Sequence, residues 1–341
     1  MCHRSVTAFF RAELTTPEIA GRRILEVGSR DVNGTVRPIL ISLGARDYVG
    51  VDLEPGPGVD RVCDVTHLAS LFDEGSFEVV VSTEMLEHVR DWRSAVSNLK
   101  RVLAPGGLLV ITTRSFGFPY HDYPGDFWRY ELDDIRGLFG DFEILKLVAD
   151  PGAPGVFLKA RKPAGFREVD TSSMGLFSVV RAERSRGDVG TEEEIQACRE
   201  RMGPLTELGL EIARVLVAVD LTDVGQRDFR NLWQTAERVS DQIERIAPGA
   251  ESLQRSSRRL ERVRRQMLEF VTAARLARGR SFGQARKALL ASAAGATGVN
   301  ILRIPWASVE QGQFRQILDA FESMRALCLK IQAYARPATG S

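Results

Sequence analysis

The chain has 341 residues, a formal net charge of +1 and a hydrophobic share of 44%. This length is long for one domain and suits two, and this apolar share is ordinary for a soluble globular protein. The near-neutral charge excludes a general attraction to nucleic acid or to an anionic membrane, so we expect no nucleic acid and no membrane as partners.

The first recognisable pattern lies in residues 24–34, which read ILEVGSRDVNG. The short apolar run 24–27 predicts a buried strand, Gly28 follows at once, and residues 35–43 have a helical pattern. A strand, a glycine turn and a helix start form nucleotide sites in α/β sheets. Glycine lets the backbone approach a ligand, and the helix N-terminus offers free N–H groups.

Two kinds of cofactor fit this turn. A dinucleotide prefers G-x-G-x-x-G, but the second and third glycine positions hold Arg30 and Asn33. A side chain there, with Asp31 beside it, makes a poor seat for a pyrophosphate. A ligand with no phosphate and an amino-acid tail suits the loop better, and Glu26 could help to hold its ammonium group. The turn therefore favours a methyl donor over a dinucleotide.

Two acidic side chains follow the next apolar stretches. Asp52 ends the strand-like run 48–51, where a carboxylate can accept hydrogen bonds from both ribose hydroxyls. Asp64 lies in the stretch 59–65, where it can accept a hydrogen bond from an adenine amino group. Both positions indicate a nucleoside ligand.

Strand and helix patterns continue to alternate after residue 76. Residues 77–82 predict a strand, 89–103 an amphipathic helix that ends at a Pro-Gly-Gly turn, and 108–112 a fifth strand. With the motifs E-x-G, V-D, E-H-V and L-x-P-G-G in this order, residues 20–162 resemble class I S-adenosylmethionine-dependent methyltransferases of the small-molecule group. Arg30 departs from that family, in which glycine is usual at this position.

The resemblance implies an enzyme with an α/β fold: a doubly wound, mostly parallel, seven-stranded Rossmann-like sheet with S-adenosylmethionine as cofactor. Residues 142–149 and 156–159 look like the closing antiparallel pair of that sheet, so we expect the domain to span residues 1–163. The predicted cofactor-binding residues are Glu26, Gly28, Ser29, Asp52, Leu53, Asp64, Val65, Thr83 and Glu84.

An aromatic-rich loop over residues 113–130 follows the fifth strand, at the strand end where ligands bind in open α/β sheets. Its segment P-x-H-x-x-P-x-D-F-W-R-Y resembles the substrate-side loop of methyltransferases that modify sugars or secondary metabolites. The predicted substrate-binding residues are Tyr120, Tyr123, Asp126, Trp128 and Arg129. Packing of the loop is the alternative role of its aromatic residues, and Asp126 and Arg129 could instead form a salt bridge that fixes it.

His121 is the first candidate for a general base, because imidazole titrates near neutrality and can take a proton from a hydroxyl. A structural hydrogen bond to Asp122 or Asp126 is its alternative role. His88, just past the fourth strand, is the second candidate. A base is needed only where the acceptor is a poor nucleophile, so His121 favours O-methylation of a hydroxyl over N-methylation.

The predicted activity is methylation of a small molecule or glycan. One alternative is a nucleotide-dependent oxidoreductase, which Arg30 and Asn33 disfavour. The other is a non-catalytic scaffold with a degenerate methyltransferase domain, against which the intact Glu26, Gly28 and Asp52 argue.

From residue 191 the pattern becomes helical. Residues 164–190 have few periodic apolar positions and are expected to be a linker with a short packed piece at 174–180. Thr191-Glu-Glu-Glu194 predicts a helix start with a capping box. Four apolar stripes then predict an antiparallel accessory bundle over residues 191–336. They are Leu205, Leu208, Ile212, Val215 and Val219; Leu232, Ala236, Val239, Ile243 and Ile246; Leu253, Leu260, Val263, Met267, Phe270 and Ala274; and Phe314, Ile317, Phe321, Met324, Cys328 and Ile331.

The cellular setting follows from smaller signals. The N-terminal residues lack a long apolar core, so we expect no signal peptide. The four cysteines are scattered without a C-x-x-C motif, which predicts neither a disulfide nor a metal site. We therefore expect a cytoplasmic enzyme, with the C-terminal helices shaping the substrate entrance or joining a homodimer.

Overall fold

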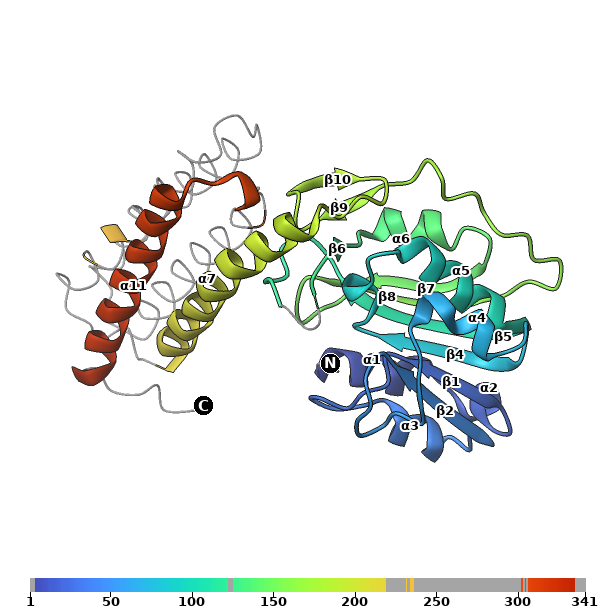
Figure 1. Ribbon diagram of the computed structural model, residues 1–341. Helices are drawn as coiled ribbons and strands as arrows, with labels where there is room; N and C mark the ends of the chain where they lie inside the picture. Colours follow the sequence, from blue (N-terminus) through green and yellow to red (C-terminus); the bar gives the residue numbers. More distant parts are fainter. Residues whose placement is uncertain are drawn as a thin grey trace, which may run out of the picture. The chain divides into compact units, whose positions relative to one another are not determined.

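The computed structural model describes residues 4–121, 125–218, 231, 234–235, 302, 304 and 306–334. The chain divides into two units (Figure 1). The first comprises residues 1–118, 123–179 and 183–189, and the second comprises 119–122, 180–182 and 190–341. The first unit therefore extends beyond residue 163, where the sequence pattern placed the end of the first domain.

A seven-stranded sheet forms the centre of the first unit. Its strands, in spatial order, are β3 (Arg61–Val62), β2 (Asp47–Asp52), β1 (Arg23–Val27), β4 (Phe77–Thr83), β5 (Leu103–Arg114), β8 (Gly155–Arg161) and β7 (Glu143–Ala149). Neighbours from β3 to β5 are parallel, whereas β8 is antiparallel to both β5 and β7. The predicted doubly wound sheet and its closing antiparallel pair are confirmed.

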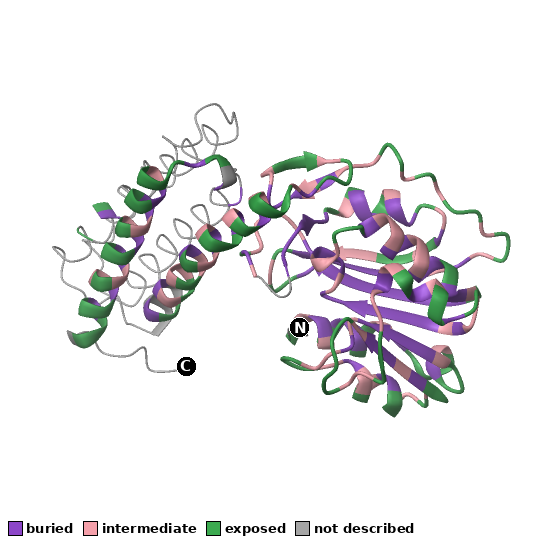
Figure 2. Ribbon diagram, viewed as in Figure 1, coloured by how far each residue is buried: buried purple, intermediate pink, exposed green. Residues whose placement is uncertain are grey.

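Helices cover both faces of this sheet, so its central strands are buried on both sides and read as continuous apolar runs (Figures 1 and 2). On one face, α1 (Arg4–Glu13), α2 (Thr16–Ile19) and α3 (Arg37–Ser42) pack their apolar side chains against Val79, Val81 and Phe157. Figure 1 shows α4 (Leu68–Leu71), α5 (Trp92–Val102) and α6 (Leu132–Leu138) over the other face. The sequence pattern does not predict α1, whose Phe9 ring lies 5.0 Å from that of Phe157.

Two element boundaries differ from the sequence pattern for local reasons. The helix predicted from residue 89 begins at Trp92, because the Asp91 carboxylate caps it and accepts from the Ser94 amide at 3.1 Å. The fifth strand begins at Leu103 rather than at residue 108. The predicted glycine turn lies inside it as an irregularity, since Phe77 pairs with Leu103 but Val79 pairs with Leu108.

The segment predicted to be a linker contributes a second, smaller sheet to the first unit. Its strands, in the order β10 (Glu183–Ser185), β9 (Leu176–Ser178) and β6 (Trp128–Arg129), are antiparallel. β9 lies within the packed piece predicted at 174–180. The Arg93 guanidinium donates to the Thr171 and Met174 carbonyl oxygens at 3.2 and 2.6 Å, which ties this segment to α5.

The second unit is helical where the structure describes it. It contains α7 (Glu192–Ala218), η3 (Trp306–Ser308) and α11 (Gln311–Tyr334), and α7 packs against α11. The predicted capping box is confirmed, because the Thr191 and Glu194 amides donate to each other's side chains at 2.8 and 3.2 Å. Within the described part of the chain, no helix has the length and apolar character needed to cross a membrane.

Two of the predicted stripes can be followed in this unit. Every member of the stripe from Phe314 to Ile331 is buried, as are Leu205, Ile212 and Val215 of the first stripe. The stripes over residues 232–246 and 253–274 lie outside the described residues, so the bundle as a whole stays a prediction.

Candidate functional site

A cavity of about 520 Å³ opens at the carboxyl ends of β1, β2 and β4. From β1 the chain adds β2 and β3 on one side and β4 and β5 on the other, so the strand order reverses between β1 and β4. Ligands of open α/β sheets bind at such switch points. The lining residues used below are Gly28, Asp52, Asp64, Glu84, His88 and Phe127.

Gly28 occupies a position that only glycine fits. Its φ of +81° lies in the left-handed region, and an added Cβ would lie 2.7 Å from the Cβ of Met85. The amides of Gly28 and Ser29 donate to the Val51 carbonyl oxygen at 2.9 and 3.0 Å, which closes the turn onto β2. The backbone can therefore come close to a ligand here.

Asp52 stands at the end of β2 with its carboxylate held by the backbone. Its Oδ2 accepts from the Arg30 amide at 3.0 Å and its Oδ1 from the Glu54 amide at 3.4 Å. The Arg30 guanidinium forms an ion pair with Glu54, and both residues line the cavity. Gly56 leaves room for Arg30, because an added Cβ there would lie 2.9 Å from its Nε.

Asp64 is fixed in the same wall as the N-cap of η1 (Val65–His67). Its Oδ1 accepts from the Thr66 amide and hydroxyl at 2.8 and 2.7 Å. The Asn98 amide group donates to the Val65 carbonyl oxygen at 2.8 Å and holds the turn against α5. Asp52, Asp64, Leu53 and Val65 are thus brought together, as predicted from the sequence.

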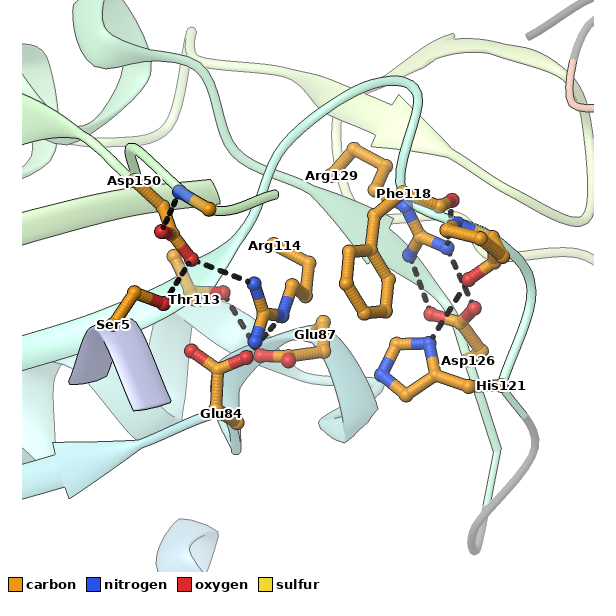
Figure 3. A network of polar contacts seen from close by, with 12 residues as sticks. Ser5, Glu84, Glu87, Thr113, Arg114, Phe118, His121, Asp126, Arg129 and Asp150 are labelled. Atoms are coloured by element: carbon orange, nitrogen blue, oxygen red, sulfur yellow. Dashed lines mark hydrogen bonds and ion pairs between the residues drawn. The ribbon is translucent and has the colours of Figure 1, made fainter. Parts of the chain in front are cut away.

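A buried charge network borders the cavity at its β4 side (Figure 3). Glu84, which follows β4 with a φ of +52°, forms an ion pair with Arg114 at the end of β5. Arg114 Nη1 lies 3.1 Å from Asp150 Oδ2, and that oxygen also accepts from the Ser5 hydroxyl at 3.1 Å. The Phe118 ring centre lies 4.2 Å from the guanidinium carbon. Three of the charged groups, Glu84, Arg114 and Asp150, are buried.

The ionisation of Glu84 is strongly affected by this setting. Burial and the charge of Glu87 raise the pKa of Glu84, the Arg114 charge and the Thr112 hydroxyl lower it, and the net result is a pKa of about 7. Glu87 is itself buried and accepts from the Thr113 hydroxyl at 2.9 Å. The cavity therefore has a carboxyl group that exchanges protons near neutral pH.

Residues 125–130 form the wall beside β4. The Phe127 amide donates to the Glu87 carbonyl oxygen, and the Val179 amide donates to the Phe127 carbonyl oxygen, both at 2.9 Å. His88 Nδ1 lies 2.5 Å from the Gly125 carbonyl oxygen. Phe127 lines the cavity, and the sequence analysis missed it. The signal available was its place in the aromatic-rich loop 113–130, next to Trp128.

Several predicted site residues do not line the cavity. Glu26 is buried and accepts from the Tyr48 hydroxyl at 2.8 Å. Ser29, in the turn after β1, and Thr83, the last residue of β4, are buried too. Among the predicted substrate residues, the Trp128 indole donates to the Val89 and Arg90 carbonyl oxygens at 3.0 and 3.1 Å. Asp126 and Arg129 form a fully buried bidentate pair, which is the loop-fixing salt bridge that the sequence left open.

Tyr120 and His121 are not among the described residues that line the cavity. Tyr120 and His121 lie in the segment 119–122 that groups with the second unit. There, His121 Nδ1 lies 3.2 Å from the Pro119 carbonyl oxygen, and Tyr120 is buried. Tyr123 lies outside the described residues.

The fold and cavity define an α/β domain with a nucleotide-type site at its switch point. Residues 4–145 match the methyltransferase domain family. A probable S-adenosylmethionine-dependent methyltransferase from Mycolicibacterium smegmatis is 30% identical over 195 residues, covering 52% of this chain and 70% of that relative. The chain belongs to the S-adenosylmethionine-dependent methyltransferases.

Other similar proteins cover less. A ubiquinone biosynthesis O-methyltransferase from Xanthomonas euvesicatoria is 35% identical over 113 residues, 29% of this chain, and the chain spans only 46% of that relative's length. A solved S-adenosylmethionine-dependent methyltransferase from Mesorhizobium loti is 18% identical, with a TM-score of 0.34, over 46% of this chain and 96% of that one. A 1,6-didemethyltoxoflavin-N1-methyltransferase from Burkholderia thailandensis, solved with S-adenosylhomocysteine, is 19% identical, with a TM-score of 0.35, over 47% of this chain and 77% of that one.

S-adenosylmethionine is the cofactor, and the residues present fit it. Its ribose hydroxyls and adenine amino group are donors, which suits two carboxylates on the β2–β3 side. Between this side and the β4 side, Gly28 lines the cavity without a side chain, so the backbone of the turn can come close to the rest of the cofactor. When bound, the cofactor supplies an activated methyl group.

Proposed function

We propose that this enzyme methylates a hydroxyl group of a small molecule or a glycan, and that Asp52 and Asp64 hold the nucleoside part of the cofactor. The observation that carries the proposal is the placement of carboxyl groups on two sides of the cavity. Fixed carboxylates line its β2–β3 side, and a carboxyl group with a pKa near neutrality lines its β4 side. The relatives named as ubiquinone biosynthesis O-methyltransferases support oxygen as the accepting atom.

A hydroxyl acceptor makes demands that an amine does not. A neutral hydroxyl is a weak nucleophile, so a nearby group must take its proton as the methyl group arrives. The rest of the catalysis is positioning, because the protein must hold acceptor and methyl group in line at near contact. A glycan or small molecule, rather than a macromolecule, suits a cavity of this size.

The histidines give the first test. If His121 is the base, His121→Ala lowers turnover about 10²–10⁴-fold and leaves cofactor affinity near that of the wild type. His88→Ala is assayed beside it, since His88 lines the cavity. Ligands that copurify with the enzyme, identified by mass spectrometry, supply the acceptor. A His121→Ala enzyme with full turnover would leave His121 without a catalytic role.

The seat of the cofactor is tested by calorimetry with S-adenosylhomocysteine. Asp52→Ala leaves the ribose hydroxyls without acceptors and is expected to weaken binding about ten- to a hundredfold, or about 1.5–3 kcal/mol. Asp47→Ala is the matched control, because Asp47 begins the same strand and pairs with Arg23 at 2.9 Å. Equal affinity in the two variants would remove Asp52 from the site, and tighter binding of NAD by the wild type would favour the oxidoreductase alternative.

A further inference from the structure

We propose that Glu84 is the catalytic base of this enzyme: its Oε1 takes the proton of the acceptor hydroxyl while Arg114 holds Oε2. This inference rests on the proposed hydroxyl methylation and deepens it. Glu84 then accepts a proton in the reaction, whereas the sequence predicted it to bind the cofactor.

The place of Glu84 in the sheet is the first argument. Asp52 and Asp64 stand beyond β2 and β3, and Glu84 stands beyond β4, with the Gly28 turn of β1 between them. A cofactor whose nucleoside lies on the β2–β3 side must extend across Gly28 toward β4 to use the rest of the cavity. Its reactive end would then be on the side of the cavity that Glu84 lines, where an acceptor would meet it.

The carboxylate of Glu84 is fixed in place by its backbone and by an ion pair. Its backbone takes a φ of +52°, which is unfavourable for a residue other than glycine, and its amide donates to the Thr112 carbonyl oxygen at 2.9 Å. Arg114 engages its Oε2 and is held in turn by Asp150 (Figure 3). A side chain fixed through a buried ion pair loses little conformational freedom when it meets a ligand.

One oxygen of this carboxylate is not engaged by Arg114. Glu84 Oε1 is buried and has no partner in hydrogen-bond geometry among the described residues, and only 6% of the residue is exposed. The Thr112 hydroxyl lies near enough to lower the pKa of the carboxyl group. His88 is the alternative base. Its Nδ1 faces the Gly125 carbonyl oxygen at 2.5 Å and carries a hydrogen, since a carbonyl can only accept, so Nε2 is the acceptor atom of the neutral ring.

The charges around Glu84 set its proton affinity near the working pH. Glu87 faces it from η2 (Leu86–His88), Arg114 from β5, and Asp150 stands behind Arg114 at the end of β7. Burial and the charge of Glu87 raise the pKa of Glu84 to about 7, against the pull of Arg114. A base is most useful when its pKa lies near the operating pH.

The step is balanced in atoms and charge. The acceptor oxygen forms a bond to the methyl carbon as the carbon–sulfur bond breaks, and the electron pair of that bond stays on sulfur. The hydroxyl proton passes to Glu84 Oε1. The carboxylic acid later returns this proton to water, so no oxidant or further co-reactant is required.

Glu84→Gln is the test, because glutamine keeps an oxygen for Arg114 and cannot take the proton. Turnover of a hydroxyl acceptor is expected to fall about 10²–10⁴-fold. Wild-type turnover is expected to rise with pH to a plateau, with a midpoint near 7, whereas the variant lacks this limb. Glu78→Gln is the control, since Glu78 lies on the same strand and accepts from the Arg23 amide at 2.7 Å.

A second measurement does not depend on turnover. The cofactor carries a positive sulfonium and its product S-adenosylhomocysteine does not, so binding of S-adenosylmethionine near pH 7 is expected to release protons from Glu84. Calorimetry in two buffers of different ionisation enthalpy measures this release. It should be larger with S-adenosylmethionine than with S-adenosylhomocysteine, and absent in Glu84→Gln.

The outcomes separate the inference from the function it rests on. A wild-type enzyme that methylates no hydroxyl acceptor contradicts the proposed function, and the proton release still tests Glu84. Hydroxyl methylation that persists at full rate in Glu84→Gln, or unchanged proton release, overturns the inference. If Glu84→Gln does not fold, Glu84→Asp keeps a carboxylate beside Arg114 and must retain the pH-dependent limb.

Discussion

Glu26 shows how one side chain of the cofactor turn bears on stability. It lies in β1 with 1% of its surface exposed, and the Tyr48 hydroxyl donates to its carboxylate. Burial raises its pKa from 4.5 to about 7, although Tyr48 and the charge of Arg37 lower it. Near neutral pH the protonated and the ionised forms of this buried carboxyl group are therefore both populated.

The sign of the resulting pH dependence is fixed. Because the folded-state pKa is raised, the stabilisation is fully present below the unfolded value and is lost as pH rises through about 7. The shift corresponds to about 3 kcal/mol. Glu26→Gln keeps an acceptor for Tyr48 and removes the titration, so the free energy of unfolding should fall less between pH 5 and 8, roughly the range around these pKa values. Urea denaturation across that range measures it.

Glu84 titrates over the same range, so the comparison needs Glu84→Gln as a second background. The two substitutions should each remove part of the pH dependence, and the double variant should remove more than either. An unchanged slope in Glu26→Gln would show that its carboxyl group is not protonated in the fold.

In the turn after β1, two features require glycine at position 28: a positive φ and a close neighbouring side chain. Gly106 has only the first of these features, so comparing the two glycines separates their effects. Gly28 has a φ of +81° and a Met85 neighbour at 2.7 Å from an added Cβ, whereas Gly106 has a φ of +79° and open space. Gly106→Ala is expected to cost about 1–2 kcal/mol from backbone strain alone. Gly28→Ala carries the same strain and the overlap with Met85, about 1–3 kcal/mol more.

Thermal melting of the two alanine variants, with cofactor titrations, measures this difference. Gly28→Ala should also weaken cofactor binding, because Met85 lines the cavity and must move. Equal stability of the two variants would mean that Met85 yields without cost and that only the backbone conformation requires glycine.

The elements that the sequence predicts well are those with a local signal. Continuous apolar runs indicate the central strands, and Asp52 and Asp64 are found because each directly follows such a run. Elements made by distant pairing are missed. β6 and β9 are two and three residues long, and they pair across about 50 residues of chain through Trp128 and Ser178. No pattern within either segment predicts that contact.

The same distinction holds for the candidate site. Arg114 is visible in the sequence as a charge at the end of an apolar strand, but its partners Glu84 and Asp150 are 30 and 36 positions away. The sequence therefore indicates a strand end and not a buried ion pair. The positive φ of Glu84 accompanies that pair and the hydrogen bond from its amide to the Thr112 carbonyl oxygen, and no local pattern predicts it.

At the scale of the whole molecule, the two units make different contributions. The cavity and the charge network belong to the first unit, and α7 and α11 pair in the second, with an ion pair between Arg325 and Glu211. No residue spacing in 191–336 suggests catalysis. We therefore predict that this part shapes the substrate entrance or joins subunits, and that it folds alone when the chain is cut near Gly190.

Substitution of Phe321 tests whether the last helix packs in the bundle core or forms a homodimer contact. It lies in α11 with 5% of its surface exposed, whereas Leu329 of the same helix is 38% exposed. If the predicted bundle core buries Phe321, Phe321→Ala should destabilise the fold by about 3–5 kcal/mol, and Leu329→Ala should change it little. If the helix instead forms a homodimer contact, the fold should survive and the dimer should dissociate. Thermal melting and light scattering of both variants distinguish these results. Unchanged melting temperature and unchanged mass in Phe321→Ala would place its side chain in solvent and contradict the predicted bundle.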